Sequence, residues 1–286
     1  MREIVMDEAR QAPERPSVID ILDPADPRIA GFRDVRERDL TRSGQFIAEG
    51  AVVLDQIVAS DRFRPVSLLV LRERLEGLGS RLSRLPADVP VYRAERDVFD
   101  RIAGFPVHRG VMALAEPVPA AGNSAIEAAL RATLDRRGSV VVACGLSNHD
   151  NMGAIFRNAA AFGAGAVILD ERACDPLYRK AIRVSVGTVF TVPFVRWGGA
   201  SAIAERLSSM GYECLALTPN AADALRDIRD TRARALFLGA EGDGLDDAVM
   251  ARCRPVRIEM APGLDSLNVA TSAALVLHHL AFPARS

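Results

Sequence analysis

The second half of the chain alternates short apolar runs with amphipathic stretches. Apolar runs of this length, bounded by glycine, proline or charged residues, are typical of strands that are buried on both faces of a sheet. Segments with apolar residues at helical spacing lie between them, and the last such segment is 266–282. The alternation predicts an α/β fold, a mostly parallel sheet covered by helices. The predicted strands are 139–146, 164–170, 189–194, 212–217, 233–239 and 254–260.

The first part of the chain repeats this alternation on a smaller scale. Its pattern predicts helices and strands for a small α/β unit of about a hundred residues. The stretch "EPVPAAGNS" at 116–124 has two prolines, a glycine and small polar residues, which is typical of a linker, and a helix over 125–138 follows it. We therefore assign 17–117 to a first domain, 118–137 to the linker and helix, and 138–286 to a second domain. The elements predicted in the first domain are helices over 28–44 and 51–60 and strands over 45–50, 65–71, 89–94 and 110–117.

Composition narrows the range of functions only slightly. The net charge is −1, which is not the strongly basic balance of many nucleic-acid-binding proteins. Lys180, however, is the only lysine among 36 basic residues. Arginine binds phosphate through a planar fork, so an arginine-only surface suits a polyanion without establishing one. Drift in composition explains the same bias and is the favoured explanation.

Cysteine and histidine usage argues against disulfides and metal sites. The four cysteines lie far apart in or near apolar segments, and neither they nor the four histidines have the spacing of metal ligands. We expect buried free thiols, a reducing compartment and no metal. The charged N-terminus, 1–16, lacks the apolar core of a signal peptide, and no apolar run reaches membrane-spanning length. These features predict a cytoplasmic protein without a membrane partner.

The glycine-rich stretch "FLGAEGDGLDD" at 237–247 suggests a nucleotide-binding loop, but it fits none of the common types. Gly239 and Gly244 have the spacing of a P-loop, whereas Leu245 and Asp246 occupy the positions of its lysine and serine or threonine. The stretch is not G-x-G-x-x-G, and the chain has no G-x-S-x-G nucleophile motif. An NTPase, a dehydrogenase and a hydrolase of these types are therefore disfavoured.

Three separated segments at the ends of predicted strands carry the remaining candidate chemistry. Each has an ordinary explanation by itself, because glycines form turns, Ser266 can cap a helix, and Arg157 can extend to solvent. An arginine within an apolar helix is nevertheless costly to bury without a partner. The segments are Asn151-x-Gly153-x-x-x-Arg157, Leu238-Gly239-x-Glu241-Gly242-x-Gly244-Leu245, and Ile258-x-Met260 with Asp265-Ser266-Leu267-Asn268-Val269-Ala270.

Together and in this order, the segments resemble the three motifs of the SpoU/TrmH family of RNA ribose 2′-O-methyltransferases, within the SPOUT superfamily. The resemblance covers 138–283. The segment from about 40 to 117 is similar, more weakly, to the ribosomal-protein-like α/β domain that often precedes this catalytic domain and binds RNA. The resemblance implies a trefoil-knotted catalytic domain, S-adenosylmethionine as cofactor, an rRNA or tRNA substrate, and a homodimer that builds the site at its two-fold interface.

The resemblance also assigns roles to individual residues. Small residues at 239–244 and 262–263 allow the close approach of backbone that a knotted cofactor pocket needs. The cofactor-binding positions implied are Leu238, Gly239, Glu241, Gly242, Ile258, Met260 and Leu267. The catalytic positions implied are Arg157, Asn151, Glu241, Ser266 and Asn268.

Arg157 is the central residue of this assignment. The family's arginine contacts an RNA phosphate beside the target ribose and is proposed to assist deprotonation of the 2′-hydroxyl. An arginine is too weakly acidic to act as a base at neutral pH, so we assign Arg157 to positioning and charge stabilisation. We expect it to point into the cleft with Gly153 beneath it, and to pair with Glu241, or with Ser266 and Asn268, when RNA is absent. Asn151 is expected to open the helix.

Two departures and two rival functions accompany this interpretation. Ala240 stands where many relatives have Asn or Ser, and "SNHDNMG" lacks an Asp-Pro that often precedes Asn151. Neither change affects the proposed catalytic residues. The first rival is an inactive RNA-binding module of the same fold, which would not bind S-adenosylmethionine. The second is an unrelated small-molecule enzyme, which would show no salt-dependent RNA binding.

Overall fold

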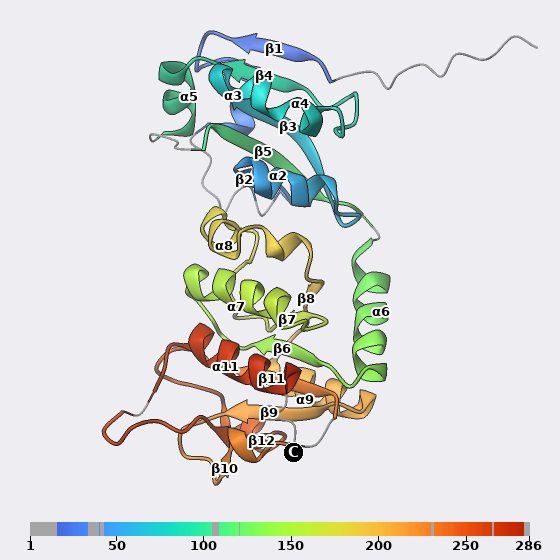
Figure 1. The fold of residues 1–286 in the computed structure, drawn as a ribbon, viewed down its shortest axis with the longest axis vertical. Helices are drawn as coiled ribbons and strands as arrows, with labels where there is room; N and C mark the ends of the chain where they lie inside the picture. Colours follow the sequence, from blue (N-terminus) through green and yellow to red (C-terminus); the bar gives the residue numbers. More distant parts are fainter. Residues whose placement is uncertain are drawn as a thin grey trace, which may run out of the picture.

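The computed structural model describes residues 16–33, 40, 43–104, 109–119, 121–229, 232–264 and 266–282. They form two β-sheets, one above the other in an elongated molecule (Figure 1). Asp265 of the third motif lies outside the described residues, as does most of the second half of the helix predicted over 28–44. The described part of that helix is a short 3₁₀ segment, Pro27–Phe32.

The smaller sheet has five strands in the order β1-β4-β3-β5-β2. Strand β3 is buried over most of its length because helices cover both faces of the sheet. Leu68 and Val70 face α2, whereas Leu69 and Leu71 face α5, so the run reads as continuously apolar. The strands are β1 (Val18–Ile21), β2 (Phe46–Glu49), β3 (Phe63–Leu71), β4 (Val91–Ala94) and β5 (Val111–Pro117). The helices are α2 (Ala51–Val58), α3 (Arg72–Leu75), α4 (Gly79–Leu82) and α5 (Arg96–Ala103).

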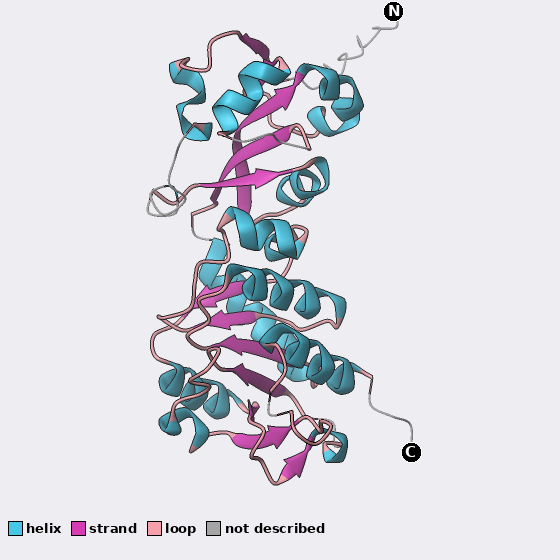
Figure 2. Cartoon of the chain, turned by 90° about the vertical axis from the view of Figure 1, so that its left-hand side faces the viewer, coloured by secondary structure: helices cyan, strands magenta, loops and turns pink. Residues whose placement is uncertain are grey.

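The larger sheet has seven strands in the order β10-β12-β9-β11-β6-β7-β8, and all its pairings are parallel (Figure 2). This confirms the predicted α/β fold with a mostly parallel sheet. The strands are β6 (Ser139–Ala143), β7 (Val167–Leu169), β8 (Phe194–Arg196), β9 (Glu213–Leu217), β10 (Asp223–Ala224), β11 (Arg234–Leu238) and β12 (Arg254–Arg257).

Helices cover both faces of this sheet, as the apolar runs predicted. Helices α7 and α11 pack on one face, and α6, α9 and α10 pack on the other. None of the described helices is long and apolar enough to cross a lipid bilayer. The helices are α6 (Ala121–Asp135), α7 (His149–Ala161), α8 (Arg179–Ser185), α9 (Ala200–Met210), α10 (Asp247–Met250) and α11 (Val269–Ala281).

The predicted strand over 189–194 is wrong. Residues Thr188–Phe190 form a 3₁₀ turn, called η3, and the strand begins only at Phe194. The run is apolar because Phe190 packs between the two sheets, where its ring lies 5.3 Å from that of Phe46 and 5.2 Å from that of Phe63. Two smaller differences concern element bounds. Helix α6 begins at Ala121, inside the predicted linker 116–124, and strand β12 ends at Arg257, before the end of the predicted strand 254–260. Strands β1 and β10 were not predicted.

Polar contacts also join the two sheets. Arg62, which precedes β3, donates from Nη2 to the carbonyls of Phe190 (3.0 Å) and Val192 (2.9 Å). Burial lowers the pKa of Arg62 to about 10, so it remains protonated at neutral pH. Glu49 on β2 pairs with Arg179 on α8, and both side chains are largely buried. One continuous apolar cluster runs through both sheets around these contacts. The domain boundaries at 117 and 138 stay a prediction.

The four cysteines are free, as predicted. Burial raises the pKa of Cys174 to about 11, and it raises the pKa of Cys144 further. Neither thiol is a thiolate at neutral pH, and the nucleophile of a cysteine enzyme is the thiolate. Within the described ranges, no group of three or more histidine, cysteine and acidic side chains could hold a metal ion.

Candidate active site

A cavity of about 1200 Å³ opens at the carboxyl ends of three neighbouring strands, β9, β11 and β12. The loops that follow parallel strands meet at one edge of a sheet, which is where α/β proteins usually bind ligands. Residues of the second and third motifs form much of its wall. All seven predicted cofactor-binding residues line it: Leu238, Gly239, Glu241, Gly242, Ile258, Met260 and Leu267.

The loop after β11 is a tight turn on one wall of this cavity. Ala240 and Gly244 exchange two backbone hydrogen bonds, of 3.2 and 3.1 Å. Gly242 and Gly244 have φ values of +91° and +69°, a region that favours glycine over other residues. A Cβ atom on Gly239 would lie only 2.4 Å from the carbonyl carbon of Gly244. The glycines of the second motif are therefore required by the shape of the loop, whatever it binds.

Three predicted catalytic side chains form a chain of hydrogen bonds beside the cavity. Asn151 is buried and donates from Nδ2 to Oε1 of Glu241, and its Oδ1 accepts from Nδ2 of Asn268 at 2.9 Å. Asn268 also caps α11, because its Oδ1 accepts from the backbone N–H of Ala270 at 2.9 Å. The structure thus joins one residue from each motif. Glu241, Asn268 and Ser266 line the cavity, whereas Asn151 supports it from behind.

The predicted position of Asn151 needs a correction. Asn148, three residues earlier, is the residue that caps α7, and it accepts from the backbone N–H of Asp150 at 2.8 Å. Asn151 lies within the first turn of the helix. Its side chain is therefore free of the capping role and reaches Glu241 instead.

Arg157 does not line the cavity of its own chain, which differs from the position expected for it. Its neighbours Ile155 and Phe156 are fully buried against the sheet, as expected, but Arg157 lies on the exposed face of α7. Within the part of the chain that the structure describes, it makes no hydrogen bond or ion pair. The predicted pairing with Glu241, or with Ser266 and Asn268, is therefore absent among the described residues, and the carboxylate of Glu241 accepts from Asn151.

Gly153 also has a different role from the predicted one. A Cβ atom there would lie 2.5 Å from the carbonyl oxygen of Ala181 and 2.8 Å from Cβ of Val184, both on α8. The glycine lets α7 and α8 pack closely against each other. It does not leave room for RNA or cofactor.

The structure adds a segment that the motif comparison missed. Residues 218–220, directly after β9, line the cavity with the hydroxyl-bearing Thr218 and the amide-bearing Asn220. Arg257, the last residue of β12, and Glu259, between the motif residues Ile258 and Met260, line it as well. The segment after β9 could have been predicted from the strand expected at 212–217, because the loops that follow parallel strands meet at the same edge of the sheet.

Comparisons with known proteins agree with this arrangement. The sequence model of the SpoU rRNA methylase family matches residues 138–278. An uncharacterized tRNA/rRNA methyltransferase of Mycobacterium tuberculosis H37Rv is 39% identical over 279 residues, which cover 94% of this chain and 93% of the relative.

Solved structures are similar over nearly the whole chain. An AdoMet-bound rRNA methyltransferase from Sinorhizobium meliloti superimposes with a TM-score of 0.76 at 20% identity, covering 92% of this chain and 97% of that one. An RNA 2′-O ribose methyltransferase gives a TM-score of 0.72 at 23% identity, covering 92% and 98%. These likenesses show a shared fold. The match to the family model and the 39% identity to the mycobacterial relative establish that the chain belongs to the SpoU rRNA methylase family.

Proposed function

We propose that this protein transfers a methyl group from S-adenosylmethionine to a ribose 2′-hydroxyl of rRNA or tRNA. The observation that carries the proposal is a cavity lined by the second and third motifs, with Asn151 of the first motif hydrogen-bonded to Glu241 and to Asn268 beside it. Membership of the SpoU rRNA methylase family supports methylation of RNA as the reaction. The ribose oxygen as acceptor rests on the resemblance of the motifs, and the structurally similar 2′-O ribose methyltransferase supports it.

The cavity suits S-adenosylmethionine. Leu238, Ile258, Met260 and Leu267 offer apolar surface for an adenine ring, and backbone at Gly239 and Gly242 can approach a ligand closely. When bound, S-adenosylmethionine supplies an electrophilic methyl group on a sulfonium. We assign the hydrogen bonds of Asn151 to Glu241 and Asn268 a structural role. They hold the loop after β11, which forms one wall of the cavity, in a single conformation.

Arg157 is proposed to position an RNA phosphate and to stabilise negative charge that develops on the ribose oxygen. A guanidinium group donates hydrogen bonds and does not act as a base, so the proton of the hydroxyl must leave by another route. The exposed position of Arg157 supports this role, because a substrate can reach it without displacing an internal partner.

We also propose a homodimer. Arg157 lies outside the cavity of its own chain, on a helix that packs against α11, and large apolar side chains are exposed on α11 or close to its ends in sequence, namely Leu264, Leu267, Leu275 and Phe282. An interface over this surface would bury them and could bring Arg157 of one protomer to the cavity of its partner. We expect light scattering after size exclusion to give twice the mass of the chain. A monomer at micromolar concentration would contradict the proposal.

The proposed role of the first domain, 17–117, is to bind RNA. Its contacts with α8 and η3 through Glu49, Arg62 and Phe46 hold it beside the catalytic unit, so it adds binding surface for a folded target. A structured rRNA loop fits this arrangement better than a short single strand. A cytoplasmic location stays a prediction.

The proposal is tested by mapping 2′-O-methyl groups in rRNA and tRNA from cells with and without the gene. We expect one position or a few to lose the modification when the gene is absent, and to regain it when the gene is returned. Calorimetric titration with S-adenosylmethionine tests the inactive-module alternative, which predicts no binding. Complete maps that do not differ between the two strains would contradict the proposed activity.

A further inference from the structure

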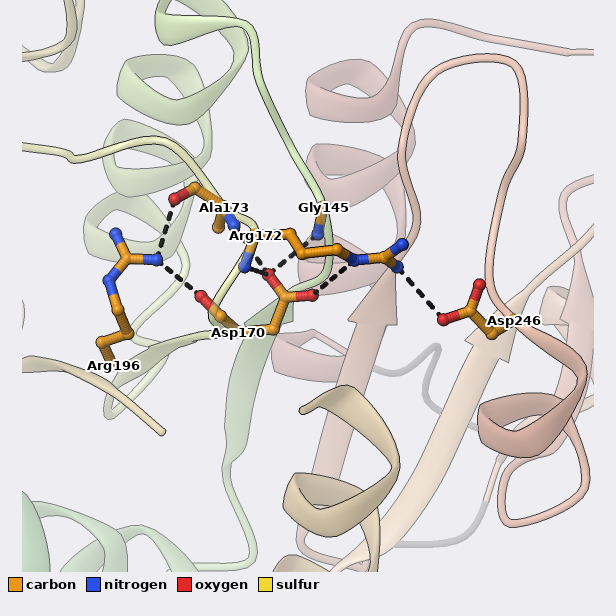
Figure 3. A network of polar contacts seen from close by, with 6 residues as sticks. All are labelled: Gly145, Asp170, Arg172, Ala173, Arg196 and Asp246. Atoms are coloured by element: carbon orange, nitrogen blue, oxygen red, sulfur yellow. Dashed lines mark hydrogen bonds and ion pairs between the residues drawn. The ribbon is translucent and has the colours of Figure 1, made fainter. Parts of the chain in front are cut away.

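Asp170, at the end of β7, belongs to none of the three motifs, yet it is almost fully buried, with 1% of its surface exposed. One carboxylate oxygen, Oδ1, accepts from the backbone N–H groups of Gly145 (2.9 Å), Arg172 (3.1 Å) and Ala173 (2.8 Å) (Figure 3). Gly145 lies in the loop after β6, and the other two lie in the loop after β7. A single oxygen therefore holds two neighbouring loops at the edge of the sheet that carries the cavity.

The second oxygen of Asp170 leads to a third loop. Its Oδ2 lies 3.8 Å from Nε of Arg172, and Nη2 of Arg172 lies 3.1 Å from Oδ2 of Asp246 (Figure 3). Asp246 directly follows the loop 239–245, which lines the cavity. The side chain of Arg172 thus connects a buried carboxylate to the far end of that loop.

The near end of the same loop is attached through α7. Glu241 accepts from Asn151, and α7 begins four residues after Gly145, whose N–H is bound to Asp170. Both attachments of the loop 239–245 therefore lead back to Asp170. We propose, on the basis of the function proposed above, that Asp170 is a positioning residue that holds the cofactor-binding loop 239–245 through Arg172 and Gly145.

The main chain around Asp170 has an independent support. Arg196 on β8 donates from Nη1 to the carbonyls of Asp170 (2.6 Å) and Ala173 (2.8 Å). The path of the loop after β7 does not depend on the charge of Asp170 alone. Asp170→Asn keeps an oxygen for the three N–H groups and places an NH₂ group opposite Arg172. It is therefore a test of the charged link and disturbs the surrounding fold little.

We expect Asp170→Asn to weaken S-adenosylmethionine binding by about tenfold, measured by calorimetry, because it removes a charged contact inside the protein. KM for S-adenosylmethionine should rise by a similar factor, while kcat at saturation stays within about twofold, since binding is lost and the chemistry is not. Asp246→Asn, at the exposed end, should weaken binding by only about threefold. The double variant should bind like Asp170→Asn alone, because both substitutions act through Arg172.

Glu127→Gln is the matched control. Glu127 on α6 pairs at 3.9 Å with Arg206 on α9, in an exposed ion pair that does not line the cavity. Its S-adenosylmethionine affinity should equal that of the native protein.

The proposal is overturned if Asp170→Asn, shown to be folded by circular dichroism, binds S-adenosylmethionine with an affinity within twofold of the native protein. It is also overturned if the loss of affinity in the double variant equals the product of the losses in Asp170→Asn and Asp246→Asn. Should Asp170→Asn fail to fold, Arg172→Gln decides: about threefold weaker binding supports the proposal, and native affinity overturns it. Native protein that binds no S-adenosylmethionine would instead contradict the proposed function itself.

Discussion

Arg157→Ala is expected to reduce methyl transfer by about 10²- to 10³-fold, the usual effect of removing a group that stabilises charge in a transition state. Stability should change by less than about 0.5 kcal/mol, because the side chain is exposed and has no internal partner among the described residues. The affinity for S-adenosylmethionine should be unchanged, since Arg157 does not line the cavity of its own chain. Transfer of labelled methyl groups to RNA, thermal unfolding and calorimetry measure the three quantities.

Arg131→Ala provides the matched control for this substitution. Arg131 is also an exposed arginine on a helix, α6, which packs on the larger sheet, and it belongs to none of the three motifs. Its replacement should leave all three measurements near native values. If the Arg157→Ala protein kept more than a third of the native activity, the proposed role of Arg157 in the reaction would be contradicted. If the protein unfolded instead, Arg157 would be a structural residue.

Gly239→Ala is expected to weaken S-adenosylmethionine binding by about tenfold to a hundredfold. The added Cβ would lie 2.4 and 2.5 Å from the carbonyl carbon and oxygen of Gly244, and 2.7 Å from the nitrogen of Leu245. These are backbone atoms of the turn 240–244, which cannot rotate away as a side chain would, so the turn itself must move. The free energy of unfolding should fall by about 1–3 kcal/mol. Calorimetry and thermal unfolding measure both effects.

Gly198→Ala is the control for an added methyl group. Nothing lies within 4 Å of a Cβ at Gly198, and its φ is not positive. Its cofactor affinity should match that of the native protein, with stability unchanged or slightly higher. If Gly239→Ala bound S-adenosylmethionine normally, the loop after β11 would not form the cofactor site.

The sequence predicts which segments of the larger sheet are buried better than it predicts which elements pack against them. The runs at 139–146 and 233–239 are apolar because helices cover both faces of the sheet, and they are strands β6 and β11. The run at 189–194 is equally apolar, but its Val189 and Phe190 pack at the contact between the two sheets. Hydrophobicity records that a residue is buried and does not identify the surface that covers it.

The same limit applies to the candidate site. The second and third motifs predicted residues that line the cavity, because each motif follows a strand whose end lies at one edge of the sheet. The first motif did not predict the direction of Arg157 or the neighbour of Gly153, which depend on how α7 is rotated against α8 and α11. The partner of Glu241 was also missed, since Asn151 and Glu241 are 90 positions apart in sequence. The knot implied by the family stays a prediction.

The contact between the two sheets bears on how the chain can vary during evolution. Arg62 is held by main-chain carbonyls at 189, 190 and 192, and its guanidinium lies 5.1 and 5.5 Å from the rings of Phe63 and Phe194. Every amino acid carries a carbonyl, so substitutions along η3 leave the acceptors in place as long as the chain keeps its path. Arg62 itself has no such substitute, because a lysine has one nitrogen and no planar fork. The hydrogen bonds of this contact therefore constrain the sequence on one side only: they require an arginine at position 62 and no particular side chain at 189, 190 or 192.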